Sequence, residues 1–211
     1  MGIKTSIKIF LVATVVALSL RLFVIEGYRV VSDSMTPVLA WGDFVLVSKF
    51  SYSLKVPFSD YEIIKIRKPS HGEVVAFSLP DIRGAVYVKR VVALEGERVE
   101  IKDGQLTIQR TPAEHRTLSD GALDGSFVEE RIGNSHWFTV RITPEAKYHY
   151  GPVDVPPGHF FVLGDNRSDS RDSRVWGPVP FSSLKGRANF IWLSLTRTTG
   201  LQWDRMGKFI H

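Results

Sequence analysis

The sequence of 211 residues contains no cysteine. A chain without thiols has no cysteine nucleophile, no cysteine-ligated zinc or iron–sulfur cluster, and no disulfide. Its redox compartment stays open, because cysteine-free chains occur in reducing and oxidising spaces alike. Serine is then the strongest candidate for any covalent catalysis.

Other familiar motifs are also missing. The six histidines form no H-E-x-x-H pair for a metal, and no G-x-S-x-G elbow is present. The sequence therefore neither supports nor excludes a histidine-based triad. We expect no metal and no other cofactor. No helix-turn-helix, finger or RNA-binding pattern accompanies the net charge of +5. We expect no nucleic acid partner and interpret the charge as suited to anionic lipid headgroups.

One stretch near the start almost lacks charge. Residues 9–20 (IFLVATVVALSL) are uncharged, and after Arg21 the apolar run resumes and ends at Ile25. A helix over residues 9–25 would be about 26 Å long, slightly less than the roughly 30 Å of the hydrocarbon core, and flanking basic side chains can extend it. A membrane-spanning helix is therefore feasible.

A cleaved secretory leader is the second interpretation of this stretch. Lys4 and Lys8 make a basic start, and Ala17-Leu18-Ser19 resembles a small-x-small cleavage site. The residues alone do not decide between the two interpretations. Both export the rest of the chain, because the positive charges that precede the segment favour a cytoplasmic N-terminus.

Beyond the apolar segment the pattern changes to short β runs bounded by glycine and proline, which predicts a mainly β fold. We expect strands at residues 43–48, 73–79, 85–94, 98–101, 105–109, 137–142, 159–163 and 188–194. Residues 110–130 are polar and rich in turn formers, so we expect a long loop there, within an inserted subdomain of residues 96–158.

Three segments could carry chemistry, and the first is SDSMTP at residues 32–37. Four of its first five side chains bear hydroxyl or carboxylate groups, and Pro37 disfavours helix before it, so taken alone the segment predicts a turn. A serine hydroxyl becomes a good nucleophile only when a neighbouring base takes its proton.

The second segment places Lys89 in the middle of a strand pattern. Alternation puts Lys89 on the same face as Tyr87, Val91 and Ala93, which are apolar or aromatic. Poor solvation of the ammonium group would lower the pKa of Lys89 and provide a neutral amine, which can act as a general base. The alternative is that Lys89 extends to water at a strand edge.

The third segment, residues 164–174 (GDNRSDSRDSR), has no large apolar residue and must be a loop, called here the 164–174 loop. Its arginines and aspartates can form bidentate pairs that stiffen an irregular backbone. A solvated charge run is the alternative. Apolar segments flank the loop on both sides, which favours an ordered loop that can hold a serine hydroxyl in place.

In this order SDSMTP, YVKRVVALEGERVE at 87–100 and GDNRSDSRDSRVWGPVP at 164–180 resemble the type I signal peptidases of bacteria. The resemblance covers nearly the whole chain, including WGDFVLVSKF at 41–50 and HGEVVAF at 71–77, and is weakest from 105 to 150. Val31 and Asp33 depart from the residues most frequent in the family, which leaves open only the detailed backbone beside the serine.

The resemblance implies a serine–lysine dyad without histidine or metal. Ser34 would be the nucleophile and Lys89 the general base, and Ser170 would orient the Lys89 amine. The Ser32 hydroxyl and the Ser34 backbone N–H would form the oxyanion hole. Structural support would come from a pair between Arg90 and Asp165 and from the bracing of Ser170 by Asp172 and Arg174.

The resemblance also implies the substrate. Exported preproteins would be cut after a small-x-small (A-x-A) site at the end of the signal peptide, with the substrate extended along the protein as an added strand. The positions that match the substrate-binding residues of the family are Tyr28, Val30, Met35, Leu39, Val45, Ala76, Tyr87 and Val88.

The implied architecture is a coiled β-sheet peptidase domain anchored by one N-terminal transmembrane helix that is not removed. It divides into an anchor (1–26), a catalytic β domain (27–95 plus 159–199), the inserted subdomain (96–158) and a C-terminal tail (200–211). The protein would be single-pass in the bacterial inner membrane, in contact with lipids, with the catalytic domain on the periplasmic side.

Two other hypotheses keep a place beside this one. A specialised conjugation-type or pilin-processing peptidase would share the dyad, and substrate profiling would separate it from a general signal peptidase. A catalytically inactive, anchored β module that binds peptide or lipid would be expected to lack Ser34 or Lys89, and both are present.

Overall fold

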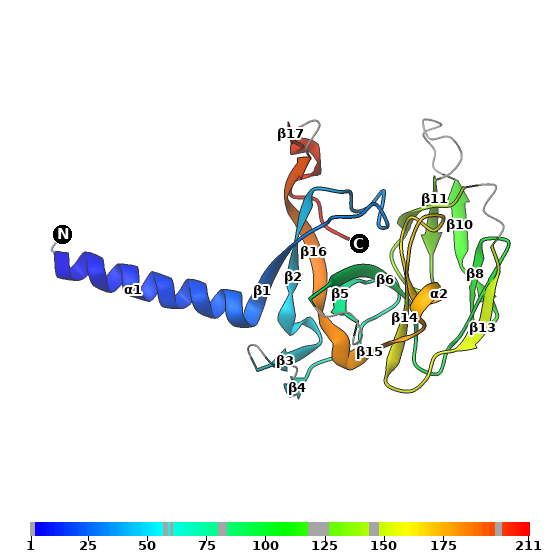
Figure 1. Ribbon diagram of the computed structural model, residues 1–211, viewed down its shortest axis with the longest axis horizontal. Coiled ribbons are helices and arrows are strands. Elements are labelled where there is room, and N and C mark those ends of the chain that lie inside the picture. The colour runs from blue at the N-terminus through cyan, green and yellow to red at the C-terminus, as the bar shows by residue number, and fades with distance from the viewer. Residues whose placement is uncertain are drawn as a thin grey trace.

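The computed structural model describes residues 3–56, 59, 61–79, 84–117, 127–143, 148–196 and 200–211. Helix α1 (Ile3–Ser19) continues through the π-helical turn η1 (Leu20–Val24) into strand β1 (Ile25–Arg29). Figure 1 shows α1 projecting away from the β body. The helix expected to include Ile25 stops one residue earlier, because Ile25 already pairs with Ser48 of the next strand. Within the described ranges, no helix meets both the length and the apolarity that a membrane crossing requires.

The mainly β prediction is confirmed. The largest sheet has the strand order β1-β2-β16-β5-β6-β14-β15, with β17 paired to β16. After β1, its strands are β2 (Asp43–Ser48), β5 (Val74–Ser78), β6 (Val86–Leu94), β14 (His159–Leu163), β15 (Val179–Pro180), β16 (Leu184–Thr196) and β17 (Gly200–Leu201). All of its strand pairs are antiparallel.

Three smaller sheets complete the described fold. One consists of β7 (Arg98–Lys102), β8 (Gln105–Ile108), β9 (Thr111–Pro112) and β13 (Tyr150–Asp154). A second contains β10 (Glu114–Thr117), β11 (Phe127–Arg131) and β12 (Phe138–Arg141), and the third is the ribbon of β3 (Ser53–Lys55) and β4 (Glu62–Lys65). The short helices are η2 (Lys49–Ser51), α2 (Ser173–Trp176), η3 (Phe181–Ser183) and η4 (Trp203–Arg205).

The prediction of a long loop over residues 110–130 is wrong for much of that range. Residues 111–112, 114–117 and 127–131 belong to strands, and residues 118–126 lie outside the described residues. Cross-strand partners of opposite charge, among them Glu114 with Arg131 and Arg116 with Glu129, stabilise β10 against β11. Because these strands are held by polar pairs, they show no apolar alternation that a sequence reading could detect.

Three apolar clusters fill the interior. The Met35 cluster contains Val30, Met35, Leu39, Val45, Val47, Val74, Ala76, Ala188, Ile191 and Ile210. The Phe77 cluster contains Tyr52, Val75, Phe77, Val91, Phe160, Val162, Val179 and Leu184. The Phe138 cluster joins the inserted strands to β6 and β14 through Val92, Ala93, Val99, Ile101, Leu106, Ile108, Ala113, Ile132, Phe138, Val140, Val155, Phe161 and Leu163.

The alternation expected along β6 holds only in part. Tyr87 and Val91 both pack in the Phe77 cluster, but Ala93 packs in the Phe138 cluster. The register between β6 and β14 shifts between Val91 and Ala93. Such a bulge turns the following side chains to a different face of the strand.

The C-terminal residues are docked on the main sheet. Ile210 is buried, and its backbone N–H donates to the carbonyl oxygen of Asn189 at 2.8 Å. Arg205 of η4 forms a two-pronged ion pair with the buried Asp43, with its shortest contact at 2.6 Å. Because Asp43 begins β2, this pair fastens the end of the chain to the strand that follows the Ser34 turn.

Candidate active site

The structure brings Ser34 and Lys89 into direct contact. Ser34 lies in the turn between β1 and β2, where the N–H of Thr36 donates to the carbonyl oxygen of Asp33. Lys89 lies in the middle of β6, paired with Val75, and is only 4% exposed. The Lys89 Nζ atom is in hydrogen-bond contact with Ser34 Oγ. The expected juxtaposition of hydroxyl and amine is therefore present.

The surroundings of Lys89 favour its neutral form. Burial lowers the pKa of Lys89 to about 8, against the opposing pull of the Asp172 and Asp165 carboxylates and with a further lowering by Arg174. With a pKa of about 8, about one lysine in ten is neutral at pH 7 and about half at pH 8. A buried amine of this kind can accept a proton from an adjacent hydroxyl.

Ser32 completes a small group of hydroxyls. Its Oγ atom lies 3.2 Å from Ser34 Oγ. The backbone N–H of Ser34 donates to no other group in the part of the chain that the structure describes. The Ser32 hydroxyl and the Ser34 backbone N–H therefore both lie close to the Ser34 hydroxyl.

The 164–174 loop packs directly against Ser34. The N–H of Asn166 donates to the Ser34 carbonyl oxygen at 3.1 Å, and its side-chain amide donates to the Asp33 carbonyl oxygen at 3.3 Å. A side chain at Gly164 would overlap with Ser170 Oγ and with the Ser34 carbonyl oxygen. Sequence reasoning missed Asn166 and Gly164, although both belong to the motif that identified the loop.

Ser170 is close to this contact but lacks the expected bond. Its hydroxyl is buried and has no hydrogen-bond partner among the described residues, so no bond to Lys89 is observed. Ser170 also lines a cavity of about 350 Å³ together with Tyr148, Arg167 and Arg174. Ser170 Oγ and the Ser34 carbonyl oxygen both lie close to Gly164, so Ser170 is near Ser34.

Arg90 and Asp165 form the expected pair. Arg90 Nε and Nη2 donate to the two Asp165 carboxylate oxygens, both at 2.7 Å, and both side chains are fully buried. Arg90 Nη1 donates in addition to the carbonyl oxygens of Gly72 and His211, both at 2.6 Å. Since Arg90 follows Lys89 directly, the pair joins the 164–174 loop to β6 beside the dyad.

Asp172 and Arg174 form a second bidentate pair within the loop. Arg174 Nε and Nη2 each donate to Asp172 at 2.8 Å, and Nη2 also reaches the Ser170 carbonyl oxygen at 3.4 Å. The Gly164 N–H donates to Asp172 at 2.9 Å. Burial alone would raise the pKa of Asp172, but these bonds outweigh it and hold the pKa below its ordinary value. Asp172 therefore stays charged and braces both ends of the loop.

The expected substrate-binding residues are mostly gathered in one place. Seven of the eight belong to the Met35 cluster or pack against it: Tyr28, Val30, Met35, Leu39, Val45, Ala76 and Val88. Tyr87 is separate, since it packs in the Phe77 cluster and its ring lies 5.2 Å from that of Trp176. Neighbouring residues of a strand point to opposite faces, so Tyr87 and Val88 cannot both join the Met35 cluster.

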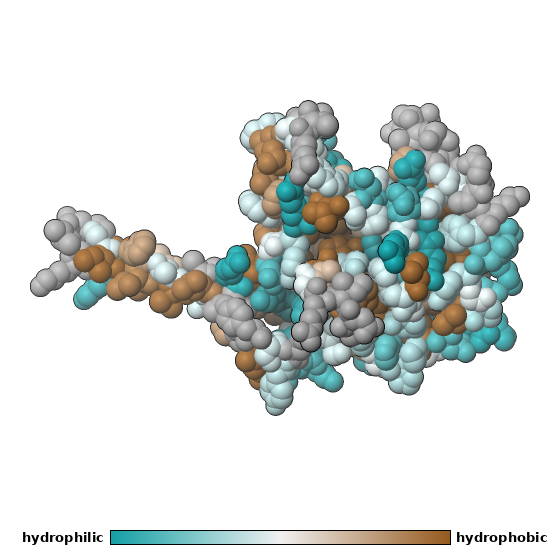
Figure 2. Space-filling model, viewed as in Figure 1, coloured by the Kyte–Doolittle hydropathy of each residue, from teal (hydrophilic) through white to brown (hydrophobic). Residues whose placement is uncertain are grey.

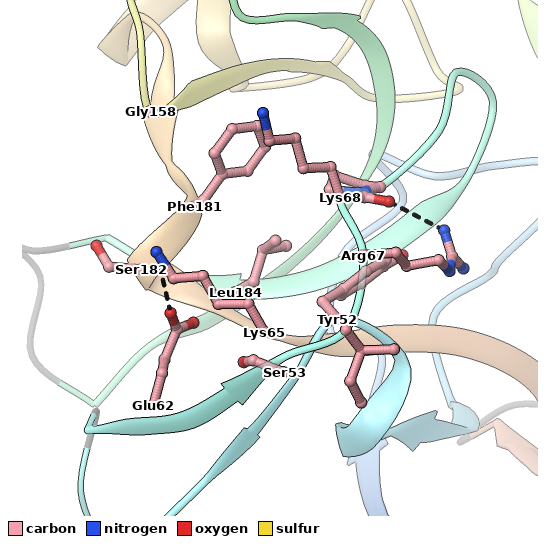
Figure 3. A pocket seen from close by; sticks show the side chains of 12 residues that line it. Tyr52, Ser53, Glu62, Lys65, Arg67, Lys68, Gly158, Phe181, Ser182 and Leu184 are labelled. Carbon is pink, nitrogen blue, oxygen red and sulfur yellow. Dashed lines mark hydrogen bonds and ion pairs between the residues drawn. The ribbon is translucent and has the colours of Figure 1, made fainter.

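A larger cavity lies elsewhere. Figure 3 shows this space of about 470 Å³ between the β3–β4 ribbon and η3, with Tyr52, Phe181 and Leu184 among its lining. Neither Ser34 nor Lys89 lines it. Across the described ranges, no group of three or more histidine, aspartate or glutamate side chains could hold a metal ion.

The chain is similar to known proteins in family and in sequence. The family model described as signal peptidase, peptidase S26, matches residues 3–193. The probable signal peptidase I-1 of Synechocystis sp. is 34% identical, over 98% of this chain and 88% of that protein. The signal peptidase I of Pseudomonas fluorescens is 33% identical, over 89% of this chain and 71% of that protein.

Among solved structures, a signal peptidase I from Enterococcus faecalis V583 is 30% identical, covers 58% of this chain and 98% of its own, and has a TM-score of 0.38. The family match spans most of the sequence, and the Synechocystis relative aligns with nearly all of it. The chain therefore belongs to the peptidase S26 family and is a type I signal peptidase, a serine endopeptidase that acts on preproteins carrying signal peptides.

Proposed function

We propose that Ser34 is the nucleophile and Lys89 the general base of this peptidase. The observation that carries the proposal is the contact between Lys89 Nζ and Ser34 Oγ, formed by a lysine that is 4% exposed. The lowered pKa of Lys89 supports the same assignment, because only a neutral amine can take the hydroxyl proton.

The reaction proceeds through an acyl-enzyme. The Lys89 amine takes the proton of the Ser34 hydroxyl as Ser34 Oγ bonds to the scissile carbonyl carbon. Collapse of the tetrahedral intermediate breaks the C–N bond, and Lys89 returns its proton to the leaving amine. Lys89 then takes a proton from a water molecule that attacks the ester. Collapse breaks the bond to Ser34 Oγ and releases the signal peptide carboxylate, and Lys89 returns the proton to Ser34 Oγ.

The oxyanion of the intermediate would be bound by the Ser32 hydroxyl and the Ser34 N–H. The 3.2 Å separation of the Ser32 and Ser34 oxygens supports this role. Ser170 would orient the Lys89 amine once its buried, unpartnered hydroxyl turns to it. Arg90 with Asp165, and Asp172 with Arg174, would hold the loop that carries Ser170.

The substrate would be the extended region that ends the signal peptide, cut after a small-x-small (A-x-A) sequence. The side chains before the cut would enter shallow sites at the Met35 cluster, where Ala76 and Val88 of neighbouring strands lie opposite each other. A site walled by such closely packed side chains suits alanine and excludes larger residues. Tyr87, on the other face of β6, would act there only through the backbone of its strand.

Residues 9–25 would anchor the protein in the bacterial inner membrane, with the N-terminus in the cytoplasm. Exposed apolar side chains along α1 support this, and they form the hydrophobic surface of the projecting helix in Figure 2. Ser34 follows only nine residues after Ile25, so the dyad would work beside lipid headgroups on the periplasmic side. The chain would divide into an anchor (1–26), a catalytic β domain (27–95 plus 159–199), the inserted subdomain (96–158) and a C-terminal tail (200–211).

The test is cleavage of a preprotein with an A-x-A site by the full-length protein in detergent. Ser34→Ala and Lys89→Ala should each abolish cleavage, whereas Lys102→Ala, which removes an exposed lysine of β7, should not change it. Substantial activity in either dyad variant would overturn the mechanism.

A further inference from the structure

A buried ion pair joins the inserted subdomain to the 164–174 loop. Arg167 Nη1 donates to Glu130 Oε2 at 3.0 Å, and Nη2 contacts Oε1. The side chains of Glu130 and Arg167 are 0% and 1% exposed. Burial alone would raise the pKa of Glu130, but Arg167 and His115 outweigh it and hold the pKa below its ordinary value. Glu130 is therefore a charged carboxylate inside the protein.

Arg167 also forms hydrogen bonds within the 164–174 loop. Its Nε donates to the Gly164 carbonyl oxygen at 3.1 Å, and Arg174 Nη1 donates to the Arg167 carbonyl oxygen at 2.7 Å. Its neighbour Asn166 donates to the carbonyl oxygen of Ser34. A short chain of contacts thus runs from Glu130 through Arg167 and Asn166 to the nucleophile.

The inserted strands add a second attachment at the same point. The N–H of Arg141 donates to the Asp165 carbonyl oxygen at 2.8 Å, and the N–H of Arg167 donates to the Arg141 carbonyl oxygen at 2.9 Å. His115 of β10 covers Glu130, with its Nε2 atom 2.9 Å from Glu130 Oε2. Strands β10, β11 and β12 therefore form a frame against which residues 164–167 are held.

Geometry, more than stability, is what such a pair supplies. Apolar side chains of similar volume often stabilise a buried site as well as an ion pair does. A bidentate arginine–carboxylate contact, in contrast, fixes two groups in one orientation. The loop it holds is irregular, and small displacements of a catalytic group cost large factors in rate.

We propose that Glu130 is a positioning residue for the Ser34–Lys89 dyad, acting through Arg167 on the 164–174 loop. The inserted subdomain then has a defined role, since it holds the loop that packs on Ser34 and closes the surroundings of Lys89. This inference rests on the proposed dyad and extends it to a residue outside the three motifs.

The test compares Glu130→Gln and Glu130→Asp with Glu129→Gln in the full-length protein. Glu129 is the adjacent residue of β11 and pairs with the exposed Arg116, so its variant is a matched control. In Glu130→Gln we expect kcat for a preprotein to fall roughly 10- to 100-fold with KM close to the wild-type value. Glu130→Asp keeps the charge and should recover part of the loss, and Glu129→Gln should match the wild type.

The pH profile separates positioning from a general loss of structure. A loosened loop exposes Lys89 to water, and since burial is the main cause of its lowered pKa, the pKa should rise from about 8 toward its ordinary value. The alkaline rise of kcat/KM should then move to higher pH in Glu130→Gln. The pH dependence of Lys89 reductive methylation reports the same pKa without requiring activity.

A Glu130→Gln variant with the wild-type kcat and pH profile would overturn the inference, whatever its melting temperature. Failure of both Glu130 variants to fold would also overturn it, because the pair would then serve the folding of the subdomain. Wild-type cleavage that survives Ser34→Ala would instead defeat the proposed function. The methylation profile would still report whether Glu130 controls the surroundings of Lys89.

Discussion

The backbone N–H of Asn166 donates a hydrogen bond to the carbonyl oxygen of Ser34 at 3.1 Å. This bond joins the arginine- and aspartate-rich loop to the turn that carries the proposed nucleophile. Lys89 approaches the same serine from β6. The geometry of the proposed dyad therefore depends on how the 164–174 loop packs against the Ser34 turn, as well as on the Ser34 and Lys89 side chains.

The activity should rise with pH. Lys89 acts as a base only when neutral, so kcat/KM should increase as pH passes through an apparent pKa of about 8 and level off above it. Below that pKa each unit of pH should lower the rate about tenfold. Preprotein cleavage from pH 5 to pH 10 measures this. A midpoint near 6.5 that survives Lys89→Ala would point to a histidine base instead.

Gly164→Ala should inactivate the enzyme and leave it folded. The added methyl group would overlap with Ser170 Oγ and the Ser34 carbonyl oxygen, so the loop must move away from the nucleophile. We expect kcat to fall roughly 100-fold. Gly158→Ala is the control for activity, because an added Cβ meets nothing there within 4 Å, although Gly158 has a positive φ that makes some loss of stability expected. Wild-type kcat in Gly164→Ala would show that the loop can shift without consequence.

Arg205→Ala should destabilise the protein strongly. The substitution leaves the fully buried Asp43 without its ion partner, and breaking such a pair costs about 3–5 kcal/mol. Arg98→Ala breaks the exposed pair with Asp154 and should cost about 1 kcal/mol or less. Urea unfolding of the wild type, Arg205→Ala and Arg98→Ala measures the change in the free energy of unfolding for each variant. Equal costs for the two variants would contradict the role assigned to the docked C-terminal segment.

The N-terminal segment should stay on the protein. If residues 9–25 are an anchor, the expressed full-length protein should sediment with membranes, resist extraction by carbonate and keep its original N-terminus. N-terminal sequencing of membrane-extracted protein checks this. A sequence that begins at Leu20 would identify the segment as a leader that is removed after Ser19.

The sequence predicted two contacts of the candidate site but not the contacts that surround them. Ser34, Lys89 and Arg90 were named from motif residues, and the structure brings the first two into contact and pairs the third with Asp165. Motifs of this kind are visible because residue type and order alone define them. The missing bond between Ser170 and Lys89 could not be foreseen, because a hydroxyl direction depends on packing around it.

The inserted subdomain was the least predictable part. Residues 114–117 and 127–131 have the composition of a loop, and their strands exist because charged side chains pair across them. Glu130 resembled any other surface carboxylate in the sequence. Its burial comes with two partners distant in the chain, Arg167 and His115.

By itself, the sequence determined which groups could react and in which order they occur, because a serine, a lysine and an absence of cysteine are properties of composition. Tertiary structure decided which of these groups meet. The packing of Asn166 on Ser34 and the burial of Glu130 both arise from contacts between distant segments. Such contacts are set by the packing of whole sheets, and no local pattern of residues encodes them.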